Sequence, residues 1–286
     1  MTEIYLNGRY MPLTEARVPV LDRGFLFGDG VYEVIPVFDG RPFRLDQHME
    51  RLENSLHSIR IRNPLQPDDW GRIFARLTSA TPELDQLIYL QITRGVDPTR
   101  NHLFSEGVAP TVFVMAWTAK PRDPSIARDG VAAVVLEDNR WQRCDIKSTA
   151  LLGNVLLRQE AADAGAEEAI LVRDGLVTEG SSTNPFIVQG EVILTPPRSN
   201  LLLRGVTRDL VLELAREAEM ACAERHVTRD ELETADEVWI CSSSREIQPV
   251  TRLDGKPVGE GAPGPLFGRI NALFQDYKAR LRSGDV

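Results

Sequence analysis

The sequence predicts an α+β protein of two domains, and three observations lead to that fold class. Segments typical of strands and of helices are interleaved without a regular strand–helix–strand repeat. The 286 residues suffice for two domains of moderate size, and their 42% hydrophobic and 26% charged content is that of an ordinary globular chain. Residues 119–125 carry two prolines and opposite charges without periodicity. We therefore expect an N-terminal domain over 1–118, a linker over 119–125 and a C-terminal domain over 126–286.

The expected N-terminal domain opens with a hairpin, because two alternating apolar runs flank Asn7-Gly8. Residues 22–30 (DRGFLFGDG) follow as a glycine-punctuated loop, and residues 31–40 (VYEVIPVFDG) as a strand rich in β-branched and aromatic side chains. Apolar residues then recur at steps of three and four from Leu45 to Ile59, which predicts a helix. The remaining expected elements are a helix over 67–80 and strands over 87–95 (LIYLQITRG) and 110–117 (PTVFVMAW).

The expected C-terminal domain contains three helices with recognisable ends and a closing helix. Gly165 can end the first, Thr207 can cap the second, and Thr228 with Glu231 forms a capping-box pattern for a short third. The elements, in order, are a strand over 131–137, a helix over 151–165, strand–turn–strand units over 167–180 and 184–196, helices over 208–220 and from 229, two strands over 237–250 around a serine cluster, and a helix over 266–281.

The composition argues against several classes of protein. The net charge is −9, and no basic stretch favours nucleic acid or an anionic membrane as a partner. No apolar run approaches the roughly 20 residues that cross a bilayer. Residues 1–13 lack the basic and apolar parts of a signal peptide, so we expect a cytoplasmic protein. Three scattered cysteines and four histidines without ligand spacing predict neither a disulfide framework nor a metal site.

Lys147 is the residue best suited to chemistry that needs an amine nucleophile. The chain has 29 Arg but only four Lys, and Lys120, Lys256 and Lys278 have the surroundings of solvated surface charges. Lys147 instead lies between a strand and a helix, next to hydroxyl residues that can cap the helix and to apolar neighbours (DIKSTALL). Desolvation there would favour the neutral amine that Schiff-base chemistry requires. An ordinary surface Lys beside Asp145 is the alternative.

Glu179 and a set of phosphate-compatible elements form a second group of candidates. Glu179 lies where a strand opens into small polar residues (TEGSSTN), which allow a ligand close approach to the carboxylate. Gly205 and Thr207 at a helix N-terminus, the hydroxyls of CSSSRE, and Arg51 on a helix are all groups that suit a phosphate. Each also has an ordinary structural interpretation, as a strand end, a helix cap or a solvated charge.

Three cationic side chains lie within nine residues, on or just after a strand. They are Arg94, Arg100 and His102, in ITRGVDPTRNHLF. Arg and His together suit a carboxylate. A charged surface loop explains the same residues equally well.

The combination of motifs says more than any single one. FGDGVYEV, QHMERL, TRG followed by Arg-x-His, RCDIKS, TEGSSTN, RGVTRD and SSSREIQPV strongly resemble the fold type IV aminotransferases that depend on pyridoxal 5′-phosphate (PLP), and most of all those acting on D-amino acids. The resemblance extends from residue 3 to about residue 278. It implies a smaller N-terminal α/β domain, a larger C-terminal pseudobarrel domain that binds PLP, and ping-pong transamination between D-amino acids, of the D-alanine and D-glutamate type, and 2-oxo acids.

The resemblance assigns the cofactor contacts. Lys147 would hold PLP as a Schiff base and, once freed by the substrate amine, move the Cα proton to C4′ as general base and then general acid. Glu179 would pair with the pyridine nitrogen and keep it protonated, so that the ring accepts electrons. The further cofactor contacts that it implies are Arg51, Val206, Thr207, Ser242 and Ser243 at the phosphate and Leu203 against the ring.

The resemblance also implies a site for the substrate carboxylate, made of Tyr32, Arg100 and His102, which would select D- over L-amino acids. In the family the Arg-x-His loop reaches in from a partner subunit, which implies a homodimer. The sequence departs from the pattern in two places: one extra residue separates TRG from Arg-x-His, which changes the expected reach of Arg100, and the hydroxyl cluster is all Ser where Thr is common.

Other activities stay open. The nearest is a transaminase of the same fold for branched-chain L-amino acids or for (R)-amines, against which the intact Arg-x-His loop argues. A lyase of this fold acting on aminodeoxychorismate is a further alternative. A PLP-binding protein without turnover is the last, although a complete carboxylate site would be superfluous in it.

Overall fold

The computed structural model describes residues 2–286, and the chain divides into two compact units. The first consists of the residues up to Pro121 together with Ile146–Leu151, and the second of Arg122–Asp145 together with Leu152–Val286. The short segment that carries Lys147 therefore folds with the first unit, although it lies beyond the start of the second in sequence. Within residues 2–286, no helix is both long and apolar enough to cross a bilayer.

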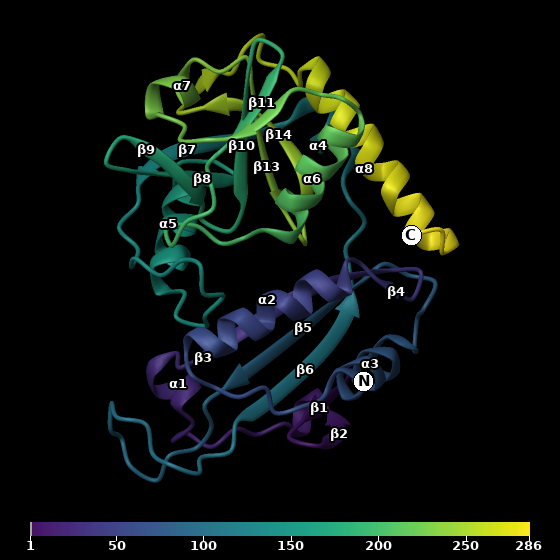
Figure 1. Ribbon diagram of the computed structural model, residues 1–286, viewed down its shortest axis with the longest axis vertical. Coiled ribbons are helices and arrows are strands. Elements are labelled where there is room, and N and C mark those ends of the chain that lie inside the picture. The colour runs from purple at the N-terminus through teal and green to yellow at the C-terminus, as the bar shows by residue number, and fades with distance from the viewer. Residues whose placement is uncertain (1) are drawn as a thin grey trace. The chain divides into compact units, whose positions relative to one another are not determined.

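An antiparallel sheet forms the frame of the first unit (Figure 1). Among the described residues of this unit, six strands pair in the order β2-β1-β6-β5-β3-β4. The hairpin expected around Asn7-Gly8 is confirmed, with Tyr5 opposite Tyr10. The strands are β1 (Glu3–Leu6), β2 (Arg9–Pro12), β3 (Gly30–Phe38), β4 (Arg41–Pro42), β5 (Gln86–Thr93) and β6 (Thr111–Thr118), and a 3₁₀ turn follows β2 at Leu13–Glu15.

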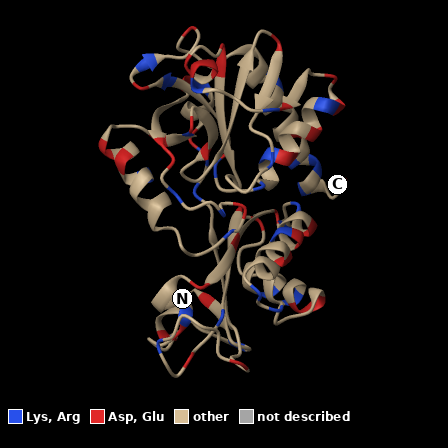
Figure 2. Cartoon of the chain, turned by 60° about the vertical axis from the view of Figure 1, so that its left-hand side comes forward, with Lys and Arg blue, Asp and Glu red and all other residues tan. Residues whose placement is uncertain are grey.

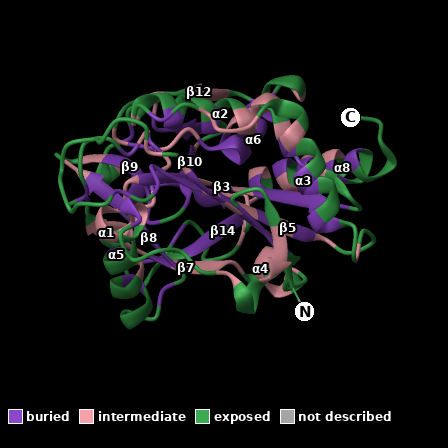
Figure 3. Cartoon of the chain, turned by 90° about the horizontal axis from the view of Figure 1, so that it is seen from below, coloured by how far each residue is buried: buried purple, intermediate pink, exposed green. Residues whose placement is uncertain are grey.

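Two helices cover one face of this sheet, α2 (Leu45–Ser58) and α3 (Pro67–Thr78). Both agree with the helices that the apolar spacing predicts. Leu52 and Leu56 of α2 and Phe74 of α3 pack with strand residues in one cluster. Figure 3 shows the strands as buried and the outer faces of the helices as exposed. Each such buried side chain stabilises the fold by about 1.5–3 kcal/mol relative to an exposed one.

Residues 22–30 differ from the sequence-based expectation of a loop, because they contain the short helix α1 (Arg23–Phe27). The Asp22 side chain caps it by accepting from the N–H of Gly24 at 2.8 Å. Gly28 ends it with φ of 65°, a conformation that favours glycine. Five residues are too few to show apolar periodicity, so the sequence pattern could not indicate this helix.

The second unit, all of whose residues are described, is built on a curled sheet of nine strands in the order β12-β11-β10-β13-β14-β7-β8-β9, with β15 paired to β14. One apolar cluster takes residues from β7 through β14, among them Ile170, Val177, Ile187 and Val250, so the sheet wraps around it. The strands are β7 (Val131–Glu137), β8 (Glu168–Arg173), β9 (Leu176–Gly180), β10 (Asn184–Gln189), β11 (Val192–Thr195), β12 (Cys222–Glu224), β13 (Glu237–Ser242), β14 (Glu246–Leu253) and β15 (Lys256–Pro257).

The helices of the second unit confirm some of the expected ends and correct others. The capping box of Thr228 and Glu231 is present. Thr207 is not the cap of its helix. The helix begins at Val206 instead of 208, and Gly205 is its N-cap. Ser148 and Thr149 do not cap a helix either, since the next one begins at Leu152. The helices are α4 (Pro124–Asp129), α5 (Leu152–Asp163), α6 (Val206–Glu217), α7 (Arg229–Glu233) and α8 (Pro265–Ser283).

Lys278 is not the solvated charge that its sequence context indicates. Its side chain is 8% exposed and its amine pairs with Glu246. Burial raises the pKa of Glu246, but Lys278 outweighs this effect and holds that pKa below its usual range. Most other charges are exposed, and Figure 2 shows both signs side by side along the helices. Exposed pairs such as Arg229 with Glu233 contribute little stability.

Candidate active site

The segment that carries Lys147 is fixed by backbone hydrogen bonds to the first strand residues of β3. The N–H of Tyr32 donates to the Lys147 carbonyl at 3.0 Å, and the N–H of Thr149 donates to the Gly30 carbonyl at 2.9 Å. From α2, the Ser55 hydroxyl accepts from the N–H of Lys147 at 3.2 Å. These three contacts hold the lysine backbone against a sheet, where its side chain is half-buried.

Strand alternation places Tyr32 next to the Lys147 amine. Successive side chains of β3 point to opposite faces. Glu33 therefore faces α2, whereas Tyr32 lies on the other face against Tyr89, with ring centroids 5.7 Å apart. The Nζ of Lys147 lies 4.2 Å from the centroid of the Tyr32 ring, a cation–π distance. Burial raises the pKa of Tyr89 to about 12, so this neighbouring phenol stays neutral.

A buried charge cluster lies on the helix-facing side of the same strand. Glu33 is fully buried and accepts from Nε and Nη2 of Arg51 at 2.7 and 2.8 Å, and it lies 2.8 Å from Nδ1 of His48. Burial favours the protonated carboxyl, but Arg51 and His48 outweigh this and hold the pKa of Glu33 well below its usual range. Burial lowers the pKa of His48, although Glu33 opposes the shift.

The cluster defines the surroundings of Arg51, the expected phosphate ligand. Its guanidinium is oriented by a bidentate pair with Glu33 rather than extended from the helix surface. Sequence reasoning missed Glu33 and His48. Their signals were the spacing of His48 and Arg51, one helical turn apart, and the position of Glu33 directly after Tyr32 in a buried strand.

In the second unit, Glu179 is held at both carboxylate oxygens. Its Oε1 accepts from Nη1 of Arg140 and its Oε2 from the N–H of Leu203 at 2.9 Å. The residue is 6% exposed at the end of β9. Burial raises the pKa of Glu179, and Arg140 offsets part of that rise. A buried carboxylate with both oxygens oriented is suited to accept one further hydrogen bond from a ring N–H.

Arg140 is a functional candidate that sequence reasoning missed. Its Nε and Nη2 donate to the two oxygens of Asp138, each at 2.9 Å, and Thr178 donates to the same carboxylate. Burial would lower the pKa of Arg140, but Asp138 and Glu179 outweigh it and raise that pKa above its usual range. In sequence Arg140 is one of 29 arginines, and no local pattern distinguishes it.

The N-terminus of α6 has the features of an anion site. Gly205 precedes the helix, and a Cβ there would come within 2.0 Å of the Asn184 Oδ1, so the Asn184 side chain would have to move for a larger residue. Val206 and Thr207 are the first helical residues, where backbone N–H groups have no partner within the helix. The Thr207 hydroxyl is buried and has no hydrogen-bond partner among the described residues. An unsatisfied buried hydroxyl beside free N–H groups fits a phosphate.

The other predicted contacts of the second unit are placed as follows. Ser242 ends β13 and Ser243 begins the turn after it, and both are half-buried. Leu203 is half-buried, and its carbonyl accepts from the amide of Asn184 at 3.0 Å. The positions of these residues are compatible with the roles that the resemblance implies, which stay predictions.

The three cationic side chains of the loop after β5 differ in their burial. Arg94 is buried and forms a bidentate pair with Asp29 at 2.8 and 2.9 Å. Arg100 and His102 are exposed, and both lie against the Phe27 ring, with a guanidinium-to-centroid distance of 5.0 Å and a centroid separation of 5.4 Å. In the part of the chain that the structure describes, no hydrogen bond, ion pair or ring contact joins either of them to Tyr32.

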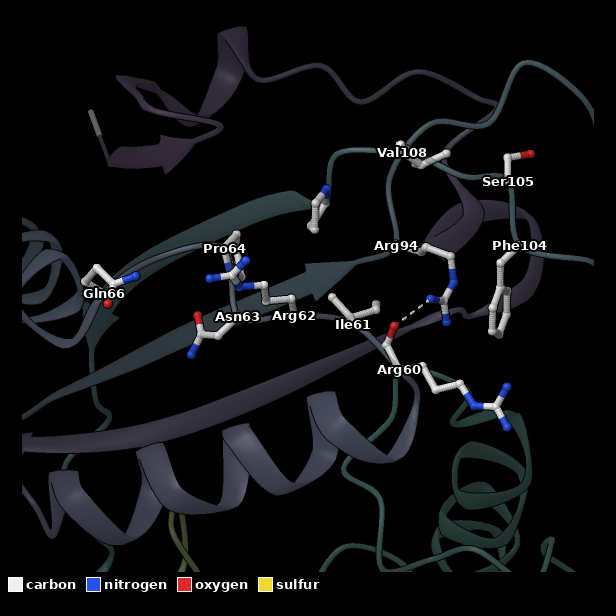
Figure 4. A pocket seen from close by; sticks show the side chains of 12 residues that line it. Arg60, Ile61, Arg62, Asn63, Pro64, Gln66, Arg94, Phe104, Ser105 and Val108 are labelled. Carbon is white, nitrogen blue, oxygen red and sulfur yellow. Dashed lines mark hydrogen bonds between the residues drawn. The ribbon is translucent and has the colours of Figure 1, made fainter.

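A pocket of about 520 Å³ lies behind this loop (Figure 4). Arg94, Phe104, Arg60 and Arg62 are among the residues that line it. None of the predicted cofactor or substrate residues lines it. The candidate groups are therefore those around Lys147 in the first unit and those around Glu179 in the second, each taken by itself, and not those of this pocket.

Comparisons with known proteins agree with this chemistry. A family model described as amino-transferase class IV matches residues 30–253. D-alanine aminotransferase of Bacillus licheniformis is 43% identical over 274 residues, which cover 96% of each chain. The branched-chain amino acid aminotransferase of Escherichia coli has a similar structure, with a TM-score of 0.90, 28% identity, and coverage of 96% of this chain and 93% of that one. A PLP-bound hypothetical aminotransferase of Mycobacterium tuberculosis matches at a TM-score of 0.85 and 25% identity, over 99% of this chain and all of the other.

Proposed function

The chain belongs to the class IV aminotransferases, and from that membership we propose that it transfers amino groups between D-amino acids and 2-oxo acids with PLP as cofactor. The predicted α+β fold of type IV is confirmed by the same matches. The observation that carries the proposal is the Lys147 amine, held 4.2 Å from the Tyr32 ring on a segment anchored to β3. The 43% identity to a D-alanine aminotransferase supports the D-amino acid substrate.

Lys147 is the group that we propose to hold the cofactor and to move the proton. Bound PLP supplies an electron sink for the charge that develops at the substrate Cα. The Lys147 amine would take the Cα proton as general base and give it back as general acid. The backbone contacts of Lys147 anchor the main chain from which the amine extends, so one anchored side chain would serve both transfers.

Glu179 and the α6 N-terminus are the groups that we propose to bind the two ends of the cofactor. The Glu179 carboxylate would keep the ring nitrogen protonated, and its raised pKa makes it a better acceptor for that proton than an exposed carboxylate. Arg140 and the N–H of Leu203 orient it. Thr207 and the N–H groups of the first helical turn would hold the phosphate, with Ser242, Ser243 and Arg51 as further ligands, and Leu203 would pack against the ring.

We propose that Tyr32, Arg100 and His102 bind the substrate carboxylate, with Arg100 and His102 contributed by a second copy of the chain. The exposure of both residues supports this, because they lie at the surface of their own unit. A carboxylate held on one side of Lys147 determines for which enantiomer the Cα proton points toward the amine, and hence the choice of D over L.

The predicted cytoplasmic location stays a prediction.

A half-reaction titration tests the proposal. The purified holoenzyme is mixed in turn with D-alanine, L-leucine and (R)-1-phenylethylamine, and conversion of the cofactor to its amine form is followed by absorbance. We expect conversion by D-alanine. Conversion mainly by L-leucine would instead favour a branched-chain activity, which the structural match to the Escherichia coli enzyme makes the second candidate. Conversion mainly by the amine would show that Arg100 and His102 do not select a carboxylate.

A further inference from the structure

The Arg23 guanidinium binds three consecutive carbonyl groups of the loop that carries Arg100 and His102. Its Nη1 donates to the carbonyls of Asn101 and Leu103, and its Nη2 donates to that of His102 at 3.3 Å. Arg23 is the first residue of α1 and is 3% exposed. A planar guanidinium with five N–H groups can hold several acceptors in one fixed arrangement, which an ammonium cannot.

Two carboxylates also hold the Arg23 guanidinium, one of them outside the loop. Its Nε pairs with Asp29 at 2.8 Å, and Asp97 lies 3.9 Å from its Nη1. Asp29 is shared with Arg94, which it binds at 2.8 Å. Burial raises the pKa of Asp29, but Arg94 and Arg23 outweigh this and hold it below its usual range, so the pair stays ionised. The N–H of Arg23 also donates to the Gly95 carbonyl at 2.9 Å, which ties α1 to the start of the loop.

The same short helix contacts the functional side chains of the loop. Phe27, one turn after Arg23, lies 5.4 Å from the His102 ring and 5.0 Å from the Arg100 guanidinium. Arg23 lies 4.9 Å from the same Phe27 ring. The backbone of the loop and its two cationic side chains are therefore both oriented from α1.

Within the described residues, no other part of the protein forms as many hydrogen bonds as Arg23 with the loop residues 101–103. Leu103 is 75% exposed, and the other hydrogen bonds at the tip are local, such as the N–H of Leu103 to the side chain of Asn101 at 3.1 Å. At the far end, Phe104 packs on the Arg94 guanidinium at 3.7 Å (Figure 4). An exposed loop with so few contacts would otherwise sample many conformations.

We propose that Arg23 is a positioning residue that sets the affinity for the substrate carboxylate by fixing the backbone at 101–103. This inference rests on the proposed role of Arg100 and His102. Arg23 itself touches no substrate. Its loss would leave the charges of the loop intact but let them move, and small displacements of binding groups lower affinity and rate strongly.

The test compares Arg23→Gln and Arg23→Lys with Arg100→Ala in the PLP-loaded enzyme. We expect Arg23→Gln to raise KM for D-alanine on the order of 10- to 100-fold, with a smaller change in kcat. Arg23→Lys, which keeps the charge but not the planar fork, should fall between it and the wild type. In the Arg100→Ala background, Arg23→Gln should raise KM by a smaller factor than in the wild type, because one of the two side chains that Arg23 positions is already absent. Hydrogen exchange of the amides at 100–104 should also be faster in Arg23→Gln.

Leu77→Ala is the matched control, because it removes a buried side chain of α3 in the same unit. The end of α3 lies beside the start of β5, where the Gln86 amide donates to the Thr78 carbonyl, whereas the loop leaves from the other end of β5. It should lower stability and leave KM unchanged. An equal rise of KM in Leu77→Ala would overturn the inference, since the effect would then be general loosening. If Arg100→Ala raises KM and Arg23→Gln does not, the proposed function stands and the role of Arg23 is wrong. If Arg100→Ala leaves KM unchanged, the carboxylate assignment itself fails.

Discussion

The Lys147 amine lies 4.2 Å from the centroid of the Tyr32 ring, and the N–H of Tyr32 donates to the Lys147 carbonyl at 3.0 Å. One tyrosine thus contacts both the backbone and the side-chain end of the lysine. The backbone contact fixes the segment, and the ring contact restrains the direction of the amine. This double contact explains how an amine on a short connecting segment is held in a defined position.

Replacing Lys147 by Ala should abolish covalent attachment of PLP. After borohydride reduction, mass spectrometry of the wild type should find the pyridoxyl group on the Lys147 peptide, and the variant should lack it. The half-reaction with D-alanine should slow by at least about 100-fold, because general acid–base catalysis is lost. Lys256→Ala, an exposed lysine of β15, serves as the control and should behave as the wild type. Label on another lysine of the variant would contradict the assignment.

Tyr32→Phe separates the contacts of the tyrosine with Lys147 from its proposed contact with the substrate. The variant keeps the ring next to Lys147 and loses the hydroxyl that we assign to the substrate carboxylate. We expect KM for D-alanine to rise roughly 10-fold, the size of one hydrogen bond to a charged group, with unchanged cofactor attachment. Tyr89→Phe, the neighbouring phenol, is the control. Loss of cofactor attachment in Tyr32→Phe would show that the hydroxyl acts on the lysine instead.

Arg140→Met should destabilise the protein strongly, because it leaves the buried carboxylates of Asp138 and Glu179 without their shared partner. Breaking such a pair from one side costs about 3–5 kcal/mol in the free energy of unfolding. Arg143→Met is the matched control, since Arg143 pairs with Asp145 at the surface and should cost less than about 1 kcal/mol. Urea unfolding of the holoenzyme measures both. Similar losses in the two variants would mean that the Arg140 cluster contributes no more than a surface pair.

The cluster around Glu33 predicts a loss of stability in acid. The pKa of Glu33 is lowered from 4.5 by Arg51 and His48 against the effect of burial, so between the two values the unfolded chain binds a proton that the folded chain does not. Stability from Glu33 is therefore complete above pH 4.5 and falls as the pH drops below it. Urea unfolding midpoints should fall less steeply with acid in Glu33→Gln than in the wild type. Parallel curves would show that Glu33 has its ordinary pKa in the folded protein.

Long periodic elements were predictable because their signal is contained in the local sequence. The helices α2, α3 and α8 and the hairpin at Asn7-Gly8 follow from apolar spacing and turn residues. The helix α1 was not predictable in this way, since its five residues are held by the Asp22 cap and by contacts with the loop at 95–103. The burial of Lys278 was missed for a related reason: its partner Glu246 is 32 residues away in sequence.

By itself the sequence determined the fold class, the family and the residue types that the chemistry needs, with Lys147 distinguished because lysine is rare in this chain. Only the tertiary structure decided what surrounds those residues. The contacts of Arg51 with Glu33, of Glu179 with Arg140 and of Arg23 with the loop at 101–103 join positions 18, 39 and 78–80 residues apart. Such contacts depend on how strands and helices pack, and packing brings together side chains whose spacing in sequence has no period.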